Sequence, residues 1–239
     1  MGYHFLKDVC RCKCINETRK EWLHMKKRTV PLAALALALL FSLAACGSGN
    51  GGMSKEELLE SAEEVSFSTL ASETYDNAVK AKETYCASPI QISGWVQNIE
   101  EDHVTLWNGG TSYDVMIDAY LPAEDIAALT TGQKVTVVGI NSDTEEKTDS
   151  WGGMSFPATH YIMDTAYLVQ SRYEISGTLV LALGQVRFDD GTDYIKNIPN
   201  INDGSFDGYQ NGDQLTISAV ISYGDGGDAY SIIEAEPVA

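Results

Sequence analysis

The residues that most often carry out chemistry are scarce in this sequence. Only two of its four histidines, His103 and His160, lie beyond residue 24, and neither belongs to a recognisable motif. Nucleophilic catalysis needs a base beside its nucleophile. Cys86 has no basic neighbour that would plainly activate it, so a packed thiol is the better interpretation. The chain also lacks a phosphate-cradling glycine loop and the HExxH pattern. These absences argue against an enzyme.

Positive charge is also scarce, except at the start of the chain. The formal net charge is -18, and after residue 45 eight basic residues are opposed by 31 acidic ones, a net charge of -23. A body this acidic repels phosphate backbones and anionic lipid headgroups. The charge therefore disfavours nucleic acid as a partner and favours a ligand that is neutral, cationic or a protein.

The one nearly continuous apolar stretch, from 30 to 45, is short. It has fewer than the roughly 20 residues that a helix needs to cross the hydrocarbon core of a bilayer. Lys26, Lys27 and Arg28 precede it, and small residues end it. A positive start, a short apolar run and small residues before a cleavage point predict a secretory signal peptide over 25–45.

The end of this stretch, Leu43-Ala44-Ala45-Cys46, resembles the lipobox of bacterial lipoproteins. The resemblance implies that the Cys46 thiol receives a diacylglyceryl group and that cleavage makes Cys46 the new N-terminus. We therefore expect a protein anchored by this lipid to the extracytoplasmic face of the cell membrane. The alternative is a buried helix that ends at Cys46. The glycine-rich residues over 46–53 favour the first interpretation, because they are typical of a flexible tether.

Residues 1–24 precede a signal that should begin near a terminus. The simplest hypothesis is that Met25 is the true start and that 1–24 is a mis-called extension. This segment contains Cys10, Cys12 and Cys14, whose spacing lacks the paired ligand groups of zinc sites. No metal is expected there.

Beyond the tether the sequence predicts two helices. Ser54 followed by Glu57 is the pattern of a capping box, which predicts a helix from about residue 55. A second helix is expected over about 69–85, with Ser68 as its N-terminal cap. Its apolar residues recur on one face at helical spacing.

From Pro89 the pattern changes to the two-residue period of strands. Strands are expected near 90–97, 104–107, 113–117, 134–140 and 161–169, with a helix at 122–129 and a long polar loop at 141–158. Three strands, a helix and two more strands is the order of an OB-fold, a five-stranded Greek-key barrel. Gly94 lies within the first strand, where such a barrel needs a bend or a bulge.

The second half of the chain repeats the first. Ile92-Ser93-Gly94 is echoed by Ile175-Ser176-Gly177, and 131–137 is echoed by 211–217. The expected fold class is mainly β, with two tandem five-stranded OB-fold-like Greek-key barrels preceded by a short helical segment. The helices and first barrel would occupy 54–169, and the second OB-fold-like domain 170–239. A single sandwich of ten strands is the alternative.

The first half also resembles a known family. The expected helix contains the stretch from Tyr75 to Tyr85, and Ile92-Ser93-Gly94-Trp95-Val96 follows it. Over residues 68–140 this arrangement is similar to the bacterial OB-fold family called tRNA_anti-like, often found on lipoproteins. The chain departs from the family in placing Cys-Ala-Ser-Pro at 86–89, where a lysine- and glycine-rich link is usual. The resemblance implies a fold and does not identify a ligand.

Candidate ligand-binding residues follow from the expected barrel. OB-folds bind on the face of strands two and three and on the loops beside it. Alternation places Val104 and Leu106 inside, so their neighbours should point outward, and exposed aromatic rings can stack on bases, sugars or a partner protein. The alternative is that Trp95 packs under the helices and the loop aromatics fold back onto the barrel. The candidate residues are Trp107, Thr105, His103, Trp151, Phe156 and Trp95.

An acidic, glycine-rich segment suggests calcium as a second kind of ligand. Its side-chain oxygens suit a hard cation, although it lacks the final glutamate of an EF-hand. Plain turns are the alternative, and they are the commoner use of such residues. The candidate ligands are Asn200, Asn202, Asp203 and Asp207. No other cofactor is expected.

Taken together, the sequence predicts a membrane-anchored extracytoplasmic lipoprotein that binds without catalysing a reaction. A protein, a peptide or a glycan is the favoured partner, because these fit both the acidic chain and the anchor. An oligonucleotide-binding OB-fold protein and a passive structural spacer of the cell envelope are the alternatives.

Overall fold

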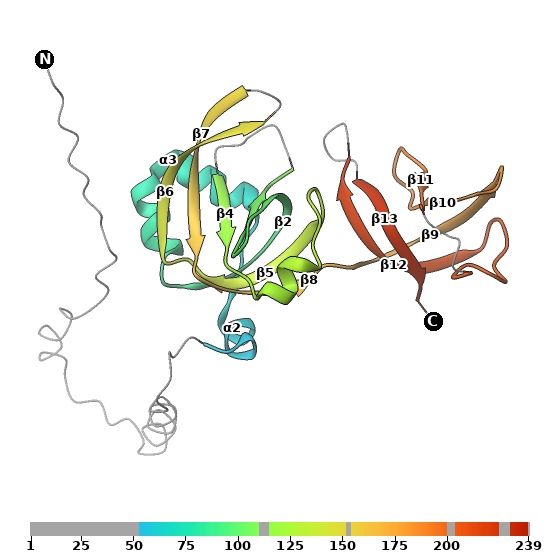
Figure 1. Cartoon of the computed structure of the whole chain (residues 1–239), viewed down its shortest axis with the longest axis horizontal. Coiled ribbons are helices and arrows are strands. Elements are labelled where there is room, and N and C mark those ends of the chain that lie inside the picture. Colours follow the sequence, from blue (N-terminus) through green and yellow to red (C-terminus); the bar gives the residue numbers. More distant parts are fainter. Residues whose placement is uncertain (1–52, 110–114, 152–153, 200–203, 225–229, 239) are drawn as a thin grey trace, which may run out of the picture. The chain divides into compact units, whose positions relative to one another are not determined.

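The computed structural model describes residues 53–109, 115–151, 154–199, 204–224 and 230–238 (Figure 1). The chain forms two units, Met1–Met53 and Ser54–Ala239, and the described residues belong almost entirely to the second. The predicted extension, the signal peptide and Cys46 lie outside the described residues. Among the described helices, none is long and apolar enough to cross a membrane.

The described chain begins with the capping box that the sequence predicts. The Ser54 hydroxyl accepts a hydrogen bond from the Glu57 amide at 3.3 Å, and the Ser54 amide donates to Glu57 Oε2 at 2.8 Å. Helix α2, Lys55–Ser61, follows, and Leu58 is its buried residue. A two-residue strand, β1 (Glu63–Glu64), then runs parallel to the edge of the first long strand.

Helix α3, Phe67–Tyr85, begins earlier than expected. Its cap is Ser66, whose hydroxyl accepts from the Thr69 amide at 3.1 Å, so the prediction of Ser68 is wrong. The helix is interrupted at Asn77, which has φ -161° and ψ 90°. Asn77 Oδ1 accepts from the Lys80 amide at 3.0 Å and thereby caps the second helical segment.

The strands after α3 form a nearly closed five-strand barrel (Figure 1). The first strand, β2 (Pro89–Ile99), pairs with β3 (Val104–Trp107) on one side and with β5 (Lys134–Ile140) on the other. β3 pairs with β4 (Val115–Ala119), and the short helix α4 (Ala123–Ala127) leads from β4 toward β5. The predicted order of three strands, a helix and a strand is therefore confirmed.

The ring is completed by one long segment that breaks at Asp164. Before the break, β7 (Met154–Met163) runs parallel to β4, with Ile117 opposite Tyr161. After the break, β8 (Thr165–Gln170) runs antiparallel to β5, with Val138 opposite Tyr167. The fifth strand of the barrel is thus shared between two partners, one at each edge.

The polar loop predicted at 141–158 is wrong, because most of it forms a strand pair. β6 (Asp143–Trp151) runs antiparallel to β7 along its whole length. β6 contains many charged and hydroxyl side chains, so a hydrophobic pattern could not reveal it. Backbone pairing to β7 stabilises the strand, and polar contacts from its side chains to neighbouring strands hold it in place.

Gly94 is explained by packing, and the bulge lies elsewhere. A Cβ at position 94 would lie 2.5 Å from Phe67 Cε2, so the glycine makes room for that ring. The register of β2 against β3 shifts between Val96 and Asn98, which places the bulge after the glycine. The barrel core that the Phe67 ring enters also includes Ile92, Val96, Leu106, Ile117, Val137, Tyr161 and Met163.

The second half forms a separate five-stranded sheet with the order β11-β10-β9-β12-β13. Its own apolar cluster includes Leu179, Phe188, Ile217 and Ile232. The strands are β9 (Tyr173–Ala182), β10 (Gln185–Asp189), β11 (Lys196–Asn197), β12 (Gln214–Tyr223) and β13 (Tyr230–Pro237).

The echo between the two halves has a structural counterpart. Gly94 lies opposite Val135, and Gly177 lies opposite Leu215, the position that the sequence echo aligns with Val135. The same hydroxyl pair follows in each half: the Ser93 and Thr136 oxygens are 2.7 Å apart, and those of Ser176 and Thr216 are 2.8 Å apart. The pairing of first and fourth strands is therefore the repeated unit. Two closed barrels are not what the described residues form.

Candidate functional site

The outer face of β3, predicted to bind a ligand, is covered. Val104 and Leu106 lie in the barrel core, as alternation predicts, and Trp107 lies in a different cluster with Met116 and Ala158. Trp107 is only 1% exposed, and Thr105 only 7%. Phe156 and Tyr223 pack against the Trp107 cluster. The face is therefore filled by the protein's own side chains.

Trp95 is half-buried and does not pack under the helices as the alternative interpretation expected. Its ring meets that of Tyr223 edge-on, with centroids 5.7 Å apart, and Lys134 Nζ lies 5.7 Å from its centroid. Gly109 has a φ of 78°, and a Cβ there would lie 2.3 Å from Trp95 Nε1. The indole is fixed by these contacts.

The other predicted binding residues are dispersed. His103 Nδ1 lies 2.8 Å from Asp102 Oδ1, and its ring stacks on Tyr120 with centroids 4.8 Å apart. Phe156 is half-buried against the Trp107 cluster. The side chain of Trp151 lies outside the described residues. The described candidates therefore do not converge on one open site.

Instead, a buried polar network crosses this part of the barrel. Its centre is Asp118, on β4, which is 1% exposed. Asp118 accepts hydrogen bonds from the Thr105 hydroxyl at 2.9 Å, from Lys147 Nζ at 2.6 Å and from His160 Nδ1 at 3.0 Å. Burial raises the pKa of Asp118, but the bonds from His160 and Lys147 outweigh it and lower the value to about 2.

His160 is bound by carboxylates at both ring nitrogens. Its Nε2 lies 2.9 Å from Asp149 Oδ2, opposite the contact with Asp118. Burial lowers the pKa of His160, but the hydrogen bonds and charges of the two aspartates raise it overall. Ionised carboxylates only accept hydrogen bonds, so these two contacts favour a proton on each ring nitrogen. In the doubly protonated form, the ring has no free lone pair with which to accept a further proton.

A second buried network lies in the second sheet around Asp190. It accepts from Lys196 Nζ at 3.0 Å, from the Thr192 hydroxyl at 2.6 Å and from the Tyr230 hydroxyl. Burial raises the pKa of Asp190, and these bonds lower it well below its usual range. Lys196 Nζ also lies 4.5 Å from the centroid of the Tyr230 ring. The sequence did not reveal the Asp118 network, because strand pairing brings its members together. In the Asp190 network, Thr192 and Lys196 follow closely in the chain, but Tyr230 comes from a distant strand.

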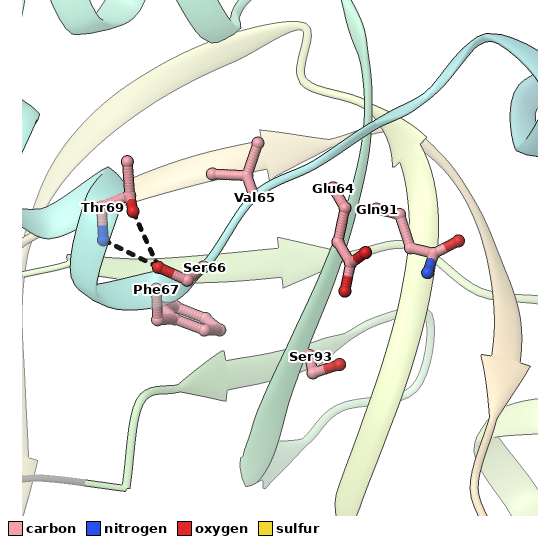
Figure 2. Close-up of a pocket in the computed structure, with 7 residues that line it drawn as sticks. All are labelled: Glu64, Val65, Ser66, Phe67, Thr69, Gln91 and Ser93. Atoms are coloured by element: carbon pink, nitrogen blue, oxygen red, sulfur yellow. Dashed lines mark hydrogen bonds between the residues drawn. The ribbon is translucent and has the colours of Figure 1, made fainter.

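A pocket of about 400 Å³ lies between the start of α3 and the outer side of β2 (Figure 2). Figure 2 shows the helix-start residues on one side and the strand residues on the other. The Val65 amide donates to the carbonyl of Gln91 at 2.9 Å and fixes the connecting segment to β2. The lining residues are Glu64, Val65, Ser66, Phe67, Thr69, Gln91 and Ser93.

Two polar side chains of this pocket have no partner among the described residues. Ser66 and Thr69 hydrogen-bond to each other at the helix cap, and the Ser93 hydroxyl bonds to Thr136. The side chains of Glu64 and Gln91 make no hydrogen bond or ion pair with the part of the chain that the structure describes. The carboxylate can accept hydrogen bonds, and the amide can both donate and accept them.

The predicted calcium segment is described only in part. Asn200, Asn202 and Asp203 lie outside the described residues. The Asp207 amide donates to the carbonyl of Gly204 at 2.9 Å, which is a turn contact. Within the described ranges, no group of three or more His, Cys, Asp or Glu side chains is placed to hold a metal ion. Calcium binding stays a prediction.

Comparison of the chain with protein-family models and with curated proteins finds no match.

Proposed function

We propose that the protein is a lipid-anchored, extracytoplasmic binding protein without catalytic activity, and that its first barrel is an OB-fold. The lipobox ending at Cys46 supports the anchor. The barrel's strand order and its parallel closure of β4 against β7 support an OB-fold. Neither histidine beyond residue 24 points to catalysis, since His160 is held between two carboxylates and His103 lines neither the pocket in Figure 2 nor another pocket in the second sheet.

The observation that carries the binding role is the pocket in Figure 2, with its two unengaged polar groups. At about 400 Å³ it falls within the range of roughly 300 to 1,000 Å³ that small-molecule sites occupy. Five of its seven lining side chains are polar, and an apolar ligand would leave the two unengaged ones, Glu64 and Gln91, without partners.

The charge of the pocket selects the kind of ligand. Its lining contains Glu64 but no lysine, arginine or histidine, and the chain after residue 45 carries a net charge of -23. Phosphates and other anions are repelled by both. A neutral molecule rich in hydroxyl groups, such as the end of a glycan, can donate hydrogen bonds to the Glu64 carboxylate. Its hydroxyl groups can also donate hydrogen bonds to the Gln91 amide and accept them from it. We therefore assign a neutral glycan end to this pocket.

The test is glycan binding by the full-chain lipoprotein in neutral detergent. Glu64→Gln removes the charge of one unengaged group and should weaken binding about tenfold, whereas Gln91→Ala removes a neutral hydrogen-bonding group and should weaken binding about threefold. Glu174→Gln is the matched control, because it removes the same charge from an exposed position on β9. Failure of every neutral glycan in a panel to bind, or an equal loss in the control, refutes the assignment.

A further inference from the structure

The second sheet is open at the position where the barrel is closed. In the barrel, the third strand β4 pairs with β7 and completes the ring. In the second sheet, the third strand β11 pairs with β10, and the last strand β13 pairs with β12. Among the described residues, β11 and β13 form no ladder with each other. We call the space between β11 and β13 the seam.

The seam contains a pocket of about 360 Å³. Both strands contribute to it: β11 supplies Lys196 and Asn197, and β13 supplies Tyr230, Ser231 and Ile232. The rest of the lining is Tyr194, Ile195, Pro199 and Gly224. The pocket therefore lies along two strand edges and differs in kind from the one in Figure 2.

The polar network around Asp190 holds one end of the seam in a fixed geometry. Asp190 accepts from Tyr230 on β13 and from Lys196 on β11, at 3.0 Å for the lysine. The ammonium group also packs over the Tyr230 ring. These contacts link the two strands through side chains, so the pocket has preformed walls although the backbones are not paired.

Apolar side chains are left in water beside this pocket. Tyr194 is 69% exposed and Ile195 is 50% exposed, and both line it. A strand edge next to exposed apolar side chains is a surface onto which another extended chain can add, since the backbone supplies hydrogen bonds and the side chains supply contact area.

The charge of the second sheet indicates what kind of extended chain would bind at this edge. Residues 171–239 contain three basic and 11 acidic side chains. All three basic ones have partners: Arg172 pairs with Glu234 at 2.7 Å, Lys196 with Asp190, and Arg187 bonds to Gln185. A second copy of this sheet would bring the same excess of acidic side chains, which disfavours self-pairing. A cationic chain is complementary.

We propose that the seam binds an extended, lysine-rich segment of a partner protein, which adds as a strand along β13 and packs its apolar side chains on Tyr194 and Ile195. This proposal is independent of the glycan pocket, because it concerns the second sheet and uses none of the same residues.

The experiment uses the full-chain lipoprotein in neutral detergent and two synthetic peptides. One peptide of eight residues alternates lysine with valine. The other has the same charge, but proline replaces every second valine, so it cannot pair along a strand. Hydrogen exchange is followed at the amides of β13 and, as an internal reference, of β2. We expect only the alternating lysine–valine peptide to slow hydrogen exchange in β13. Neither peptide should change hydrogen exchange in β2.

Variants then locate the contact. Replacing Tyr194 and Ile195 by alanine should weaken binding of the alternating peptide at least fivefold. Leu183→Ala is the control, because Leu183 is an exposed apolar residue at the β9–β10 turn, 98% exposed and away from the seam lining. Circular dichroism checks that each variant is folded. If the double variant does not fold, the proposal is tested by the comparison of hydrogen exchange in β13 with each of the two peptides.

Three results would overturn the proposal. Equal binding of both peptides would show attraction by charge alone, and an equal loss in Leu183→Ala would place the contact elsewhere. Protection of β13 that rises with protein concentration in the absence of peptide would identify a second copy as the occupant. Slowed exchange confined to β13, with binding lost only in the double variant, is the result that supports the seam.

Discussion

Gly94 lies against the ring of Phe67, and the lack of a side chain makes that contact possible. A Cβ there would lie 2.5 Å from Phe67 Cε2 and 3.1 Å from the carbonyl oxygen of Trp107. The sequence predicted a structural role for this glycine, but the role that it suggested was a bend or a bulge in the strand. The true cause is a ring supplied by the start of α3, and such a contact leaves no trace in the pattern of the strand itself.

Replacing Gly94 with alanine should therefore destabilise the barrel by about 1–3 kcal/mol, the usual cost of overpacking. The free energy of unfolding in urea measures this cost. In a Phe67→Leu background the smaller side chain leaves room for the new methyl group, so the same substitution should cost less. An identical cost in both backgrounds would show that the Phe67 ring is not the reason for the glycine.

At the scale of elements, the network around Asp118 connects four neighbouring strands. Thr105 comes from β3, Asp118 from β4, Lys147 and Asp149 from β6, and His160 from β7. The sequence did not predict this network, because the segment that forms β6 was expected to be a loop. In addition, the register between two strands cannot be read from the sequence of either strand alone. A buried polar cluster formed by several strands is thus harder to predict than the alternation of apolar and polar residues along each strand.

The stability of the barrel should depend on pH through this network. The pKa of His160 is raised, so its contribution is fully present below its unfolded value of about 6.5 and is lost as the pH rises through the folded value. The pKa of Asp118 is lowered to about 2, so its contribution is present above about 3.8 and is lost as the pH falls through the folded value. Stability should therefore be highest between these limits.

Unfolding in urea from about pH 4 to about pH 9 tests the alkaline side of this dependence. His160→Gln should lower the stability near pH 5 and should flatten the decline above pH 6.5, because the titrating group is gone. His103→Gln serves as the control and should keep the decline, since His103 lies outside the network. A decline that persists unchanged in His160→Gln would assign it to another group.

Local signals along the chain predicted more of the elements than of the site. The capping box at Ser54 and strand β5 at 134–140 depend on neighbouring residues, and both are found as expected. The echo between the halves corresponds to a shared strand pairing but not to the second closed barrel that it suggested. The cap of α3 was misplaced because Ser66 and Ser68 both suit that role. The open face expected around Trp107 was wrong because Phe156 and Tyr223, distant in sequence, cover it.

At the scale of the whole molecule, the two halves differ in how they use their fifth strand. In the barrel this segment breaks at Asp164, so β7 pairs with β4 and β8 pairs with β5. In the second half, β13 pairs with β12 from Ile217 opposite Pro237 to Tyr223 opposite Tyr230. The whole of β13 lies along one partner, and among the described residues no strand other than β10 pairs with β11. A repeat in sequence therefore fixes the shared strand pairing without fixing closure.

The proposed lipid anchor would hold the acidic residues after position 45 close to a membrane surface that would otherwise repel them. A net charge of -23 after residue 45 opposes adsorption to anionic headgroups, so we propose that attachment depends on a lipid at Cys46. Cys46→Ser should abolish both membrane fractionation and incorporation of labelled fatty acid in cells. Cys86→Ser is the matched control, because it removes the other cysteine beyond residue 24 and should leave both unchanged. If the Cys46→Ser protein stays in the membrane and labelled, the protein is held there by something other than this thiol.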